Sequence, residues 1–183
     1  MLWLSIALLV LLGGSLLYAA VRLRKKDKRM DASSVIVSLL LYAALMITVL
    51  ILRLDVPHYI LWLGLLTVWL NGYLGYGLNK YNTSNRFDRY LHVFGSFSFA
   101  LIAYCIIRSF MPEGGSKLFR AVFVCALGGF LGAAFEVIEF IQDKKKGTHN
   151  QHGLQDTNID LAANLVGSVL AGVFAFFFLL APG

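Results

Sequence analysis

Six runs of mostly apolar residues alternate with short polar stretches along the chain, and each run is about as long as a membrane-spanning helix. A helix needs about 20 such residues to cross a hydrocarbon core of about 30 Å. The runs are Leu2–Ala20, Ser33–Leu52, Tyr59–Leu78, Tyr90–Ile107, Leu118–Ile141 and Ile159–Leu180. This pattern predicts an all-α integral membrane protein, folded as a bundle of six transmembrane helices.

The composition agrees with this prediction. Of the 183 residues, 58% are hydrophobic and 14% are charged, and the mean hydropathy is +0.73. Soluble domains have about 25% charged residues. The connections between the runs are short, without repeats or long linkers, so we expect a single transmembrane domain over residues 1–183.

Basic residues gather in every second connection between the predicted helices. Twelve of the sixteen lie there: Arg22, Arg24, Lys25, Lys26, Lys28, Arg29, Lys80, Arg86, Arg89, Lys144, Lys145 and Lys146. Basic loops stay in the cytoplasm, so both termini of this multi-pass protein are expected outside. Membrane lipids are then the natural partners, including anionic headgroups near the basic segments. Because these topology signals account for the net charge of +6, we do not expect the protein to bind nucleic acid.

The two halves of the chain differ in their polar content. The first three runs are nearly free of ionisable residues, and Asn71 is their main strongly polar side chain. We interpret these runs as a scaffold. The last three runs each carry acidic or histidine residues at the predicted cytoplasmic end, so residues 88–172 are the expected site region.

The fourth run begins with "FDRYLHVFGSFSFA". Asp88, His92 and Ser96 are four residues apart, a spacing that places all three on one helix face. Asp88 could equally be a helix N-cap, and a lone histidine is more often structural than a ligand. The two become candidates because of the acids on the following helices.

The fifth run places two glutamates on a glycine stripe. Gly128, Gly132 and Glu136 follow at steps of four, and Glu139 lies three residues further on. Glycines at this spacing let helices approach closely in lipid, so the stripe should face the bundle interior. If the helix ends near Gln142, the glutamates also lie at the end where the helix dipole disfavours negative charge. Capping therefore does not explain them.

The sixth run continues the pattern. One face of this predicted helix carries acidic residues at its start and small residues further along. These residues recur at steps of four: Asp156, Asp160, Asn164, Ser168 and Gly172. Asp156 could be an N-cap, and Asn164 could bond a neighbouring helix. Carboxylates from three helices then lie in one leaflet beside a histidine, and they cannot all stay ionised and unpaired.

The connection "QDKKKGTHNQHGLQD" lies beside these acids. A solvated loop whose lysines enforce topology is the favoured interpretation. Alternatively, the loop captures a phosphate headgroup with help from Gln155 and the helix N-terminus. His149 and His152 are a weak metal signal, because neither a cysteine nor a fixed helix accompanies them.

Three motifs in this order, "FDRYLHVFG", "FEVIEF" and "GLQDTNID", resemble the YjdF family of small bacterial inner-membrane proteins. The last helix is also similar, more distantly, to VanZ-like membrane proteins, which open it with an Asp-x-x-x-Asn pattern like Asp160 and Asn164. The likeness covers residues 88–172. It implies a multi-pass protein of the bacterial cytoplasmic (inner) membrane, with a role in the cell envelope, and the VanZ-like relation implies a link to glycopeptide (teicoplanin) resistance.

Three functions remain open for such a site. The first is a divalent-metal-dependent enzyme that acts on a lipid or lipid-linked envelope substrate, with the cation activating water. The second is binding or transport, gated by protonation or cation binding. The third is a structural role, in which the acids share hydrogen bonds or pair with Arg86, Arg89 and Lys144. Whether the protein is an enzyme, and in which oligomeric state it works, stays open.

The enzyme hypothesis gives each polar residue a role. Catalysis falls to His92 and Glu136; metal binding to Glu139, Asp156 and Asp160; substrate binding to Asp88, Gln155 and Asn164. The cofactor expected here is a divalent cation of unspecified identity, and the ligand expected is a lipid-type molecule.

Overall fold

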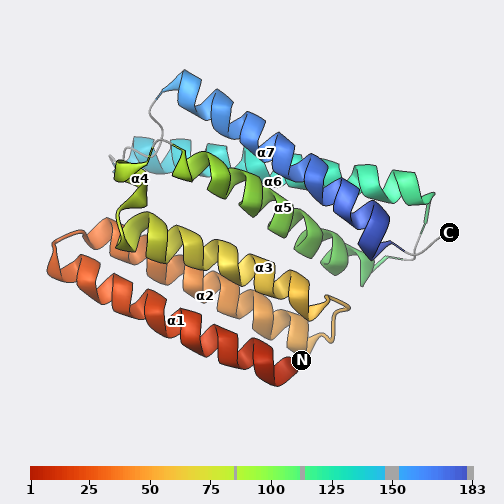
Figure 1. The fold of residues 1–183 in the computed structure, drawn as a ribbon, viewed down its shortest axis with the longest axis horizontal. Coiled ribbons are helices and arrows are strands. Elements are labelled where there is room, and N and C mark those ends of the chain that lie inside the picture. Colours follow the sequence, from red (N-terminus) through yellow and green to blue (C-terminus); the bar gives the residue numbers. More distant parts are fainter. Residues whose placement is uncertain (85, 112–113, 147–152, 181–183) are drawn as a thin grey trace. The chain divides into compact units, whose positions relative to one another are not determined.

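The structure, a computed structural model, describes residues 1–84, 86–111, 114–146 and 153–180, with the Lys146 side chain excepted. Helices and their connections make up all of this, and it contains no strand. The contacts divide the chain into two compact units, residues 1–91 and residues 92–183. Figure 1 shows the helices of each unit.

Three long helical segments form the first unit. Its elements are α1 (Leu2–Lys25), α2 (Arg29–Ile51), α3 (His58–Trp69), the π-helix η1 (Leu70–Gly77) and the short α4 (Lys80–Thr83). The helices α1, α2 and α3 pack against one another (Figure 1). Leu16, Val35 and Ile60, one from each helix, are fully buried and form part of the core.

Glycine explains why η1 can pack closely against α1 and α2. A side chain at Gly72 would meet Leu16 at 2.5 Å and Val35 at 3.3 Å, so only hydrogen fits there. Gly75 is likewise covered by the ring of Tyr81. A π-helical stretch often marks a special packing or functional constraint, and here it accompanies this close helix contact.

Polar side chains inside the first unit find partners in neighbouring helices. Tyr81 donates a hydrogen bond of 2.5 Å to Asn71, the polar residue that the sequence singled out in the third run. Trp62 donates to the buried Ser5 hydroxyl at 2.8 Å. These contacts satisfy groups that would otherwise be costly to bury, and they agree with a scaffold role.

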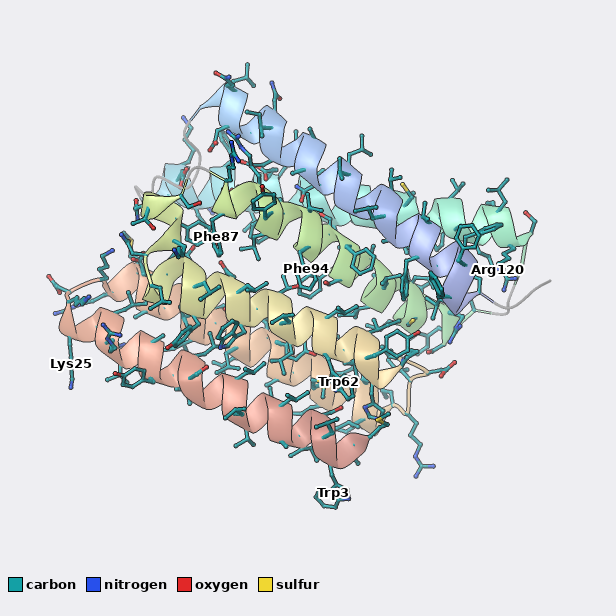
Figure 2. The ribbon with its side chains drawn as sticks, viewed as in Figure 1. Trp3, Lys25, Trp62, Phe87, Phe94 and Arg120 are labelled. Carbon is teal, nitrogen blue, oxygen red and sulfur yellow. The ribbon has the colours of Figure 1, made fainter. Side chains whose placement is uncertain are left out.

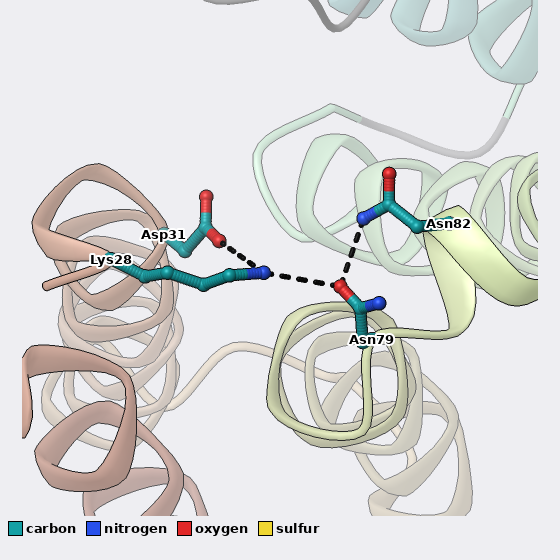
Figure 3. Close-up of polar contacts among 4 residues, drawn as sticks. All are labelled: Lys28, Asp31, Asn79 and Asn82. Carbon is teal, nitrogen blue, oxygen red and sulfur yellow. Dashed lines mark hydrogen bonds and ion pairs between the residues drawn. The ribbon is translucent and has the colours of Figure 1, made fainter. Parts of the chain in front are cut away.

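Polar side chains connect the turn between α1 and α2 with the segment that follows η1. Asp27 has a φ of 58°, a left-handed conformation that Asp tolerates better than most residues. The Lys28 ammonium lies 3.8 Å from Asp31 and donates to Asn79 at 3.2 Å, and Asn82 donates to the same oxygen at 2.9 Å (Figure 3). The α1–α2 turn is thereby tied to the end of η1.

The second unit contains α5 (Phe87–Arg108), which begins before the unit boundary, α6 (Lys117–Lys146), α7 (Leu154–Phe174) and the π-helix η2 (Ala175–Leu179). The helices α6 and α7 lie side by side (Figure 1). Their closeness depends on the predicted glycine stripe, because a side chain at Gly132 would overlap Asn164 at 2.6 Å. A side chain at Gly167 would strike the Val93 carbonyl, so α5 and α7 also meet backbone to backbone.

Five helices in the described part of the chain are long and apolar enough to cross a membrane: α1, α2, α5, α6, and α7 with η2. The predicted α-helical membrane protein is thus confirmed. The remaining predicted span, Tyr59–Leu78, coincides with α3 and η1, which have 12 and 8 residues. Figure 2 shows Trp3 and Lys25, both exposed, at opposite ends of α1.

Candidate functional site

The polar stripes of the last three long helices turn toward the interior of the second unit. His92 on α5 is 8% exposed, and Glu136 on α6, Asp160 on α7 and Asn164 on α7 are each 4% exposed. The predicted inward orientation of Glu136 is therefore confirmed. Buried ionisable side chains are rare in apolar membrane helices and commonly mark a functional site.

Regular helix geometry places these side chains. On α7, Asp160, Asn164 and Ser168 are buried while Leu161 and Leu165 between them are exposed, as a spacing of four predicts. On α6 the buried face continues from Gly128 and Gly132 to Glu136. The small residues draw the helices together, and the polar residues follow on the same faces.

Asn164 is the centre of the hydrogen bonding. Its Oδ1 accepts a hydrogen bond of 2.7 Å from the Ser96 hydroxyl, and the Nδ1 atom of His92 lies 3.2 Å from the same oxygen. The same Nδ1 is 3.6 Å from Glu136 Oε1. Ser168 donates to the Asn164 carbonyl at 2.6 Å. One asparagine on α7 thus joins two residues of α5, and one of these two, His92, lies beside an acid of α6.

Asp88, His92 and Asp160 each offer a ligand atom, and these three atoms lie within 4.8 Å of one another. Asp88 is half-buried and the other two are buried. Although the unit boundary falls after Leu91, Asp88 lies one turn before His92 on the same continuous helix. Its place relative to His92 follows from α5 alone.

This group has donors that divalent cations use. Imidazole nitrogen and carboxylate oxygen together are ligands for zinc, manganese or iron, whereas calcium and magnesium sites consist of oxygen alone. Buried carboxylates also need a cation, a proton or hydrogen-bond donors to be tolerated. The residues present therefore fit a divalent cation of the transition-metal type.

Helix dipoles affect the acids unequally. Asp88 and Asp156 lie in the first turns of α5 and α7, where the dipole favours negative charge. The helix α6 continues to Lys146, about one turn beyond the end expected from the sequence. Glu136 is therefore roughly 15 Å from that end at 1.5 Å per residue. The predicted penalty on the glutamates is small, since the dipole effect fades within the last turn.

Other predicted site residues lie around this core. Glu139 and Asp156 are half-buried, and Gln155 is exposed in the first turn of α7. Among the residues that the structure describes, the three-residue group includes Asp88, which was expected to bind substrate, and does not include Glu139 or Asp156. His149 and His152 lie outside the described residues.

Sequence reasoning gave no site role to Ser96, Ser168 or Phe135. The two serines stood on the same rows of four as His92 and Asn164, so the spacing itself was the signal. Phe135 packs edge-on against the imidazole, with ring centroids 6.0 Å apart. Nothing in the spacing marks Phe135, because its neighbour Glu136 points to the buried face while Phe135 is half exposed.

Comparison with known proteins gives a family without a described activity. An uncharacterized protein of Thermotoga maritima is 34% identical over 105 residues, which are 55% of this chain and 53% of that protein. The match therefore spans about half the length of this relative. No solved structure matches the chain. Residues 2–181, nearly the whole chain, match the family described as predicted membrane protein (DUF2238), and the chain belongs to that family.

Proposed function

We propose that the protein binds a divalent cation within the membrane, through Asp88, His92 and Asp160. The observation that carries this proposal is the convergence of three ligand atoms within 4.8 Å from two helices in a largely buried place. Glu136 adds a carboxylate 3.6 Å from the imidazole. Glu139 and Asp156, half-buried nearby in sequence, are further candidate ligands when the site loads.

The finer proposal is a metal-dependent enzyme that acts on a lipid or lipid-linked substrate of the bacterial envelope. A bound divalent cation supplies Lewis acidity and a nucleophilic water at neutral pH. Glu136 is buried beside His92 and would accept the proton of that water. Of the residues predicted to bind substrate, Gln155 is exposed and would contact its polar part, whereas Asp88 would hold the cation and Asn164 is buried against Ser96.

The proposal includes a topology and a relationship. Six spans, with α3 and η1 as the third, would leave both termini outside and the site in the cytoplasmic leaflet of the inner membrane. The motif resemblance to YjdF proteins, over residues 88–172, supports this assignment because it lies within the residues 2–181 that match DUF2238. The VanZ-like relation stays a prediction from the pattern at Asp160 and Asn164.

Burial favours a second candidate, a protein that binds or transports a cation without catalysis. Glu136 and Asp160 are each 4% exposed, and a lipid-sized substrate needs more access than that. Buried acids inside membrane helices commonly carry protons or ions. Both candidate functions use the same cation site. Only the enzyme would convert a lipid substrate into a product.

Metal content and thermal unfolding of the detergent-purified protein test the shared proposal. Zn²⁺, Mn²⁺ and Fe²⁺ should raise the unfolding midpoint with concentration, because binding to the folded state stabilises it. Asp88→Asn and Asp160→Asn should fold but lose most of that shift, because each removes one of the three proposed ligands. Asp27→Asn is the matched control, because Asp27 is 86% exposed and Asn tolerates its left-handed backbone.

The result decides between the candidates in two steps. If no cation shifts the wild-type midpoint, or if Asp160→Asn shifts equally, the cation site is wrong. If cations bind, incubation of the loaded protein with envelope lipid extract, followed by mass spectrometry, separates an enzyme from a binding protein.

A further inference from the structure

Exposed basic residues end the first helix of the first unit. Arg22, Arg24 and Lys25 occupy the last turn of α1, and Lys26 is its C-terminal cap. All four side chains are exposed. We propose that three of them, Arg22, Lys25 and Lys26, bind the headgroup of an anionic phospholipid, and we call these three the α1 basic patch. The patch shares no residue with the proposed cation site, so the inference goes beyond the proposed function and does not depend on it.

The acids of the α1–α2 turn leave the charges of this patch unpaired. Asp31 lies 3.8 Å from the Lys28 ammonium, and Asp27 lies 3.1 Å from Arg29 Nε. Within the described part of the chain, no carboxylate forms an ion pair with a residue of the α1 basic patch. The helix dipole favours cations at this end of α1 without neutralising them. Three positive charges are therefore available to an anion.

The patch continues the side of α1 that faces lipid. Leu16 and Leu23 lie on the buried side of this helix. The other side carries apolar residues that are each more than half exposed: Val10, Leu11, Leu17, Tyr18 and Val21. Arg22 and Lys25 follow Tyr18 by four and seven residues, and these spacings share a helix face. Figure 2 shows the Lys25 side chain extending away from this end of α1. A lipid whose acyl chain lies along the exposed side would bring its phosphate to the patch.

Tyr18 indicates the depth of the patch in the membrane. The guanidinium carbon of Arg22 lies 5.9 Å from the centroid of the Tyr18 ring, within the range of a cation–π contact. Tyrosine rings in membrane helices favour the level of the lipid headgroups. The Arg22 stem covers apolar surface there while its charged end reaches the polar layer. The α1 basic patch therefore lies at the depth of the lipid phosphates.

A topology signal alone does not account for this placement. The positive-inside rule counts basic residues anywhere in a short loop and does not require them on the lipid-facing side of a helix. In this segment Lys28 and Arg29, further into the turn, are the residues that pair with acids. The unpaired residues of the patch instead continue the lipid-facing side of α1. Charge and position together match an anionic lipid, whose phosphate and acyl chains meet at this depth.

Native mass spectrometry of the detergent-purified chain tests the site, with phosphatidylglycerol as the anionic lipid and phosphatidylcholine of the same acyl chains as the reference. Each basic residue near an anionic membrane surface strengthens the attraction about fivefold. Wild type should therefore bind phosphatidylglycerol at least about 10-fold more tightly than phosphatidylcholine. The triple variant Arg22→Gln/Lys25→Gln/Lys26→Gln should lose this preference. If the triple variant fails to fold, the single variant Lys25→Glu should lower the phosphatidylglycerol affinity by at least about fivefold.

The matched control is Arg86→Gln/Arg89→Gln/Lys145→Gln, which removes the same charge at exposed positions outside α1 and should keep the preference. An equal loss in this control would assign the effect to net charge and overturn the inference. Equal binding of the two lipids by wild type overturns it whatever the variants do. Displacement of bound phosphatidylglycerol by an equal concentration of inorganic phosphate would also overturn it, because the patch would then recognise a free anion rather than a lipid.

Discussion

A carboxylate inside a membrane helix costs free energy unless a cation, a proton or hydrogen-bond donors accompany it. Asp160 and Glu136 are almost completely buried, so their surroundings decide their chemistry. His92 lies beside both the Glu136 carboxyl and the Asn164 amide. At the residue scale, the short distances from one buried imidazole to these oxygens distinguish the site from a set of helix caps.

The grouping of Asp88 with His92 predicts which acids bind the cation most strongly. Asp88→Asn and Asp160→Asn should each lower the affinity for Zn²⁺ or Mn²⁺ by at least about 10-fold, because loss of a ligand should cost no less than loss of its supporting residue. Glu139→Gln should cost less, because Glu139 is outside the three-residue group. Isothermal titration of the purified protein measures the three affinities. A larger loss for Glu139→Gln than for Asp88→Asn would contradict the grouping.

Ser96 offers a second residue-scale prediction. Ser96→Ala removes the donor at 2.7 Å from Asn164 Oδ1 and should lower the free energy of unfolding by about 1 kcal/mol. Reversible unfolding in mixed detergent measures the change. Ser33→Ala is the control, since that exposed hydroxyl bonds only within its own α2 turn. Equal effects from the two variants would mean that the Ser96 contact adds nothing.

At the scale of the elements, small residues determine how close the helices come. The packing of α6 on α7 uses Gly132 against Asn164, and the crossing of α5 and α7 uses Gly167 against the Val93 backbone. Without a hydrophobic driving force in lipid, such close contacts supply much of the helix association. The polar site therefore depends on glycines that contribute no chemistry of their own.

Two glycine substitutions separate this packing role from helix propensity. Gly167→Ala should destabilise the protein by about 1–3 kcal/mol, because the new methyl group meets the backbone of α5 rather than a movable side chain. Gly129→Ala should be neutral or stabilising by up to about 1 kcal/mol, because nothing lies within 4 Å and alanine favours a helix. Thermal unfolding in one detergent compares the two. A Gly167→Ala protein as stable as wild type would show that α5 and α7 do not meet there.

At the scale of the whole molecule, charge placement and helix number decide the topology. Five helices meet the length and hydropathy of a span within the described residues, and α3 with η1 adds a sixth candidate of similar total length. An even number of spans puts both termini on one side. Twelve of sixteen basic residues then lie on the other side, as expected for a cytoplasmic face.

Labelling of single cysteines tests this topology. With Cys105 and Cys125 replaced by Ala, Ser84→Cys should resist an impermeant thiol reagent on intact cells, and Ser116→Cys should react. Both positions should react after the membrane is opened, which controls for access. Strong labelling of position 84 and none of position 116 in intact cells would reverse the topology and contradict the sixth span or the charge rule.

The sequence alone determined the helices and their buried faces. A segment in lipid must satisfy its own backbone hydrogen bonds, so an apolar run of sufficient length has almost no alternative to a helix. The spacing of four then decided that Asp160, Asn164 and Ser168 share a face. Both conclusions follow from local geometry, which is why they agree with the structure.

The tertiary structure decided which faces meet and at what depth. By their spacing in the sequence, Asp88, Glu139 and Asp156 are equally good candidate ligands. Only the packing of α5 against α7 places Asp88 in the group with His92 and Asp160. The partner of Asn71, Tyr81, comes from an element that the apolar pattern did not predict. The physical reason is that helix crossings and the rotation of each helix depend on glycine contacts between distant segments, and a pattern within one segment does not contain them.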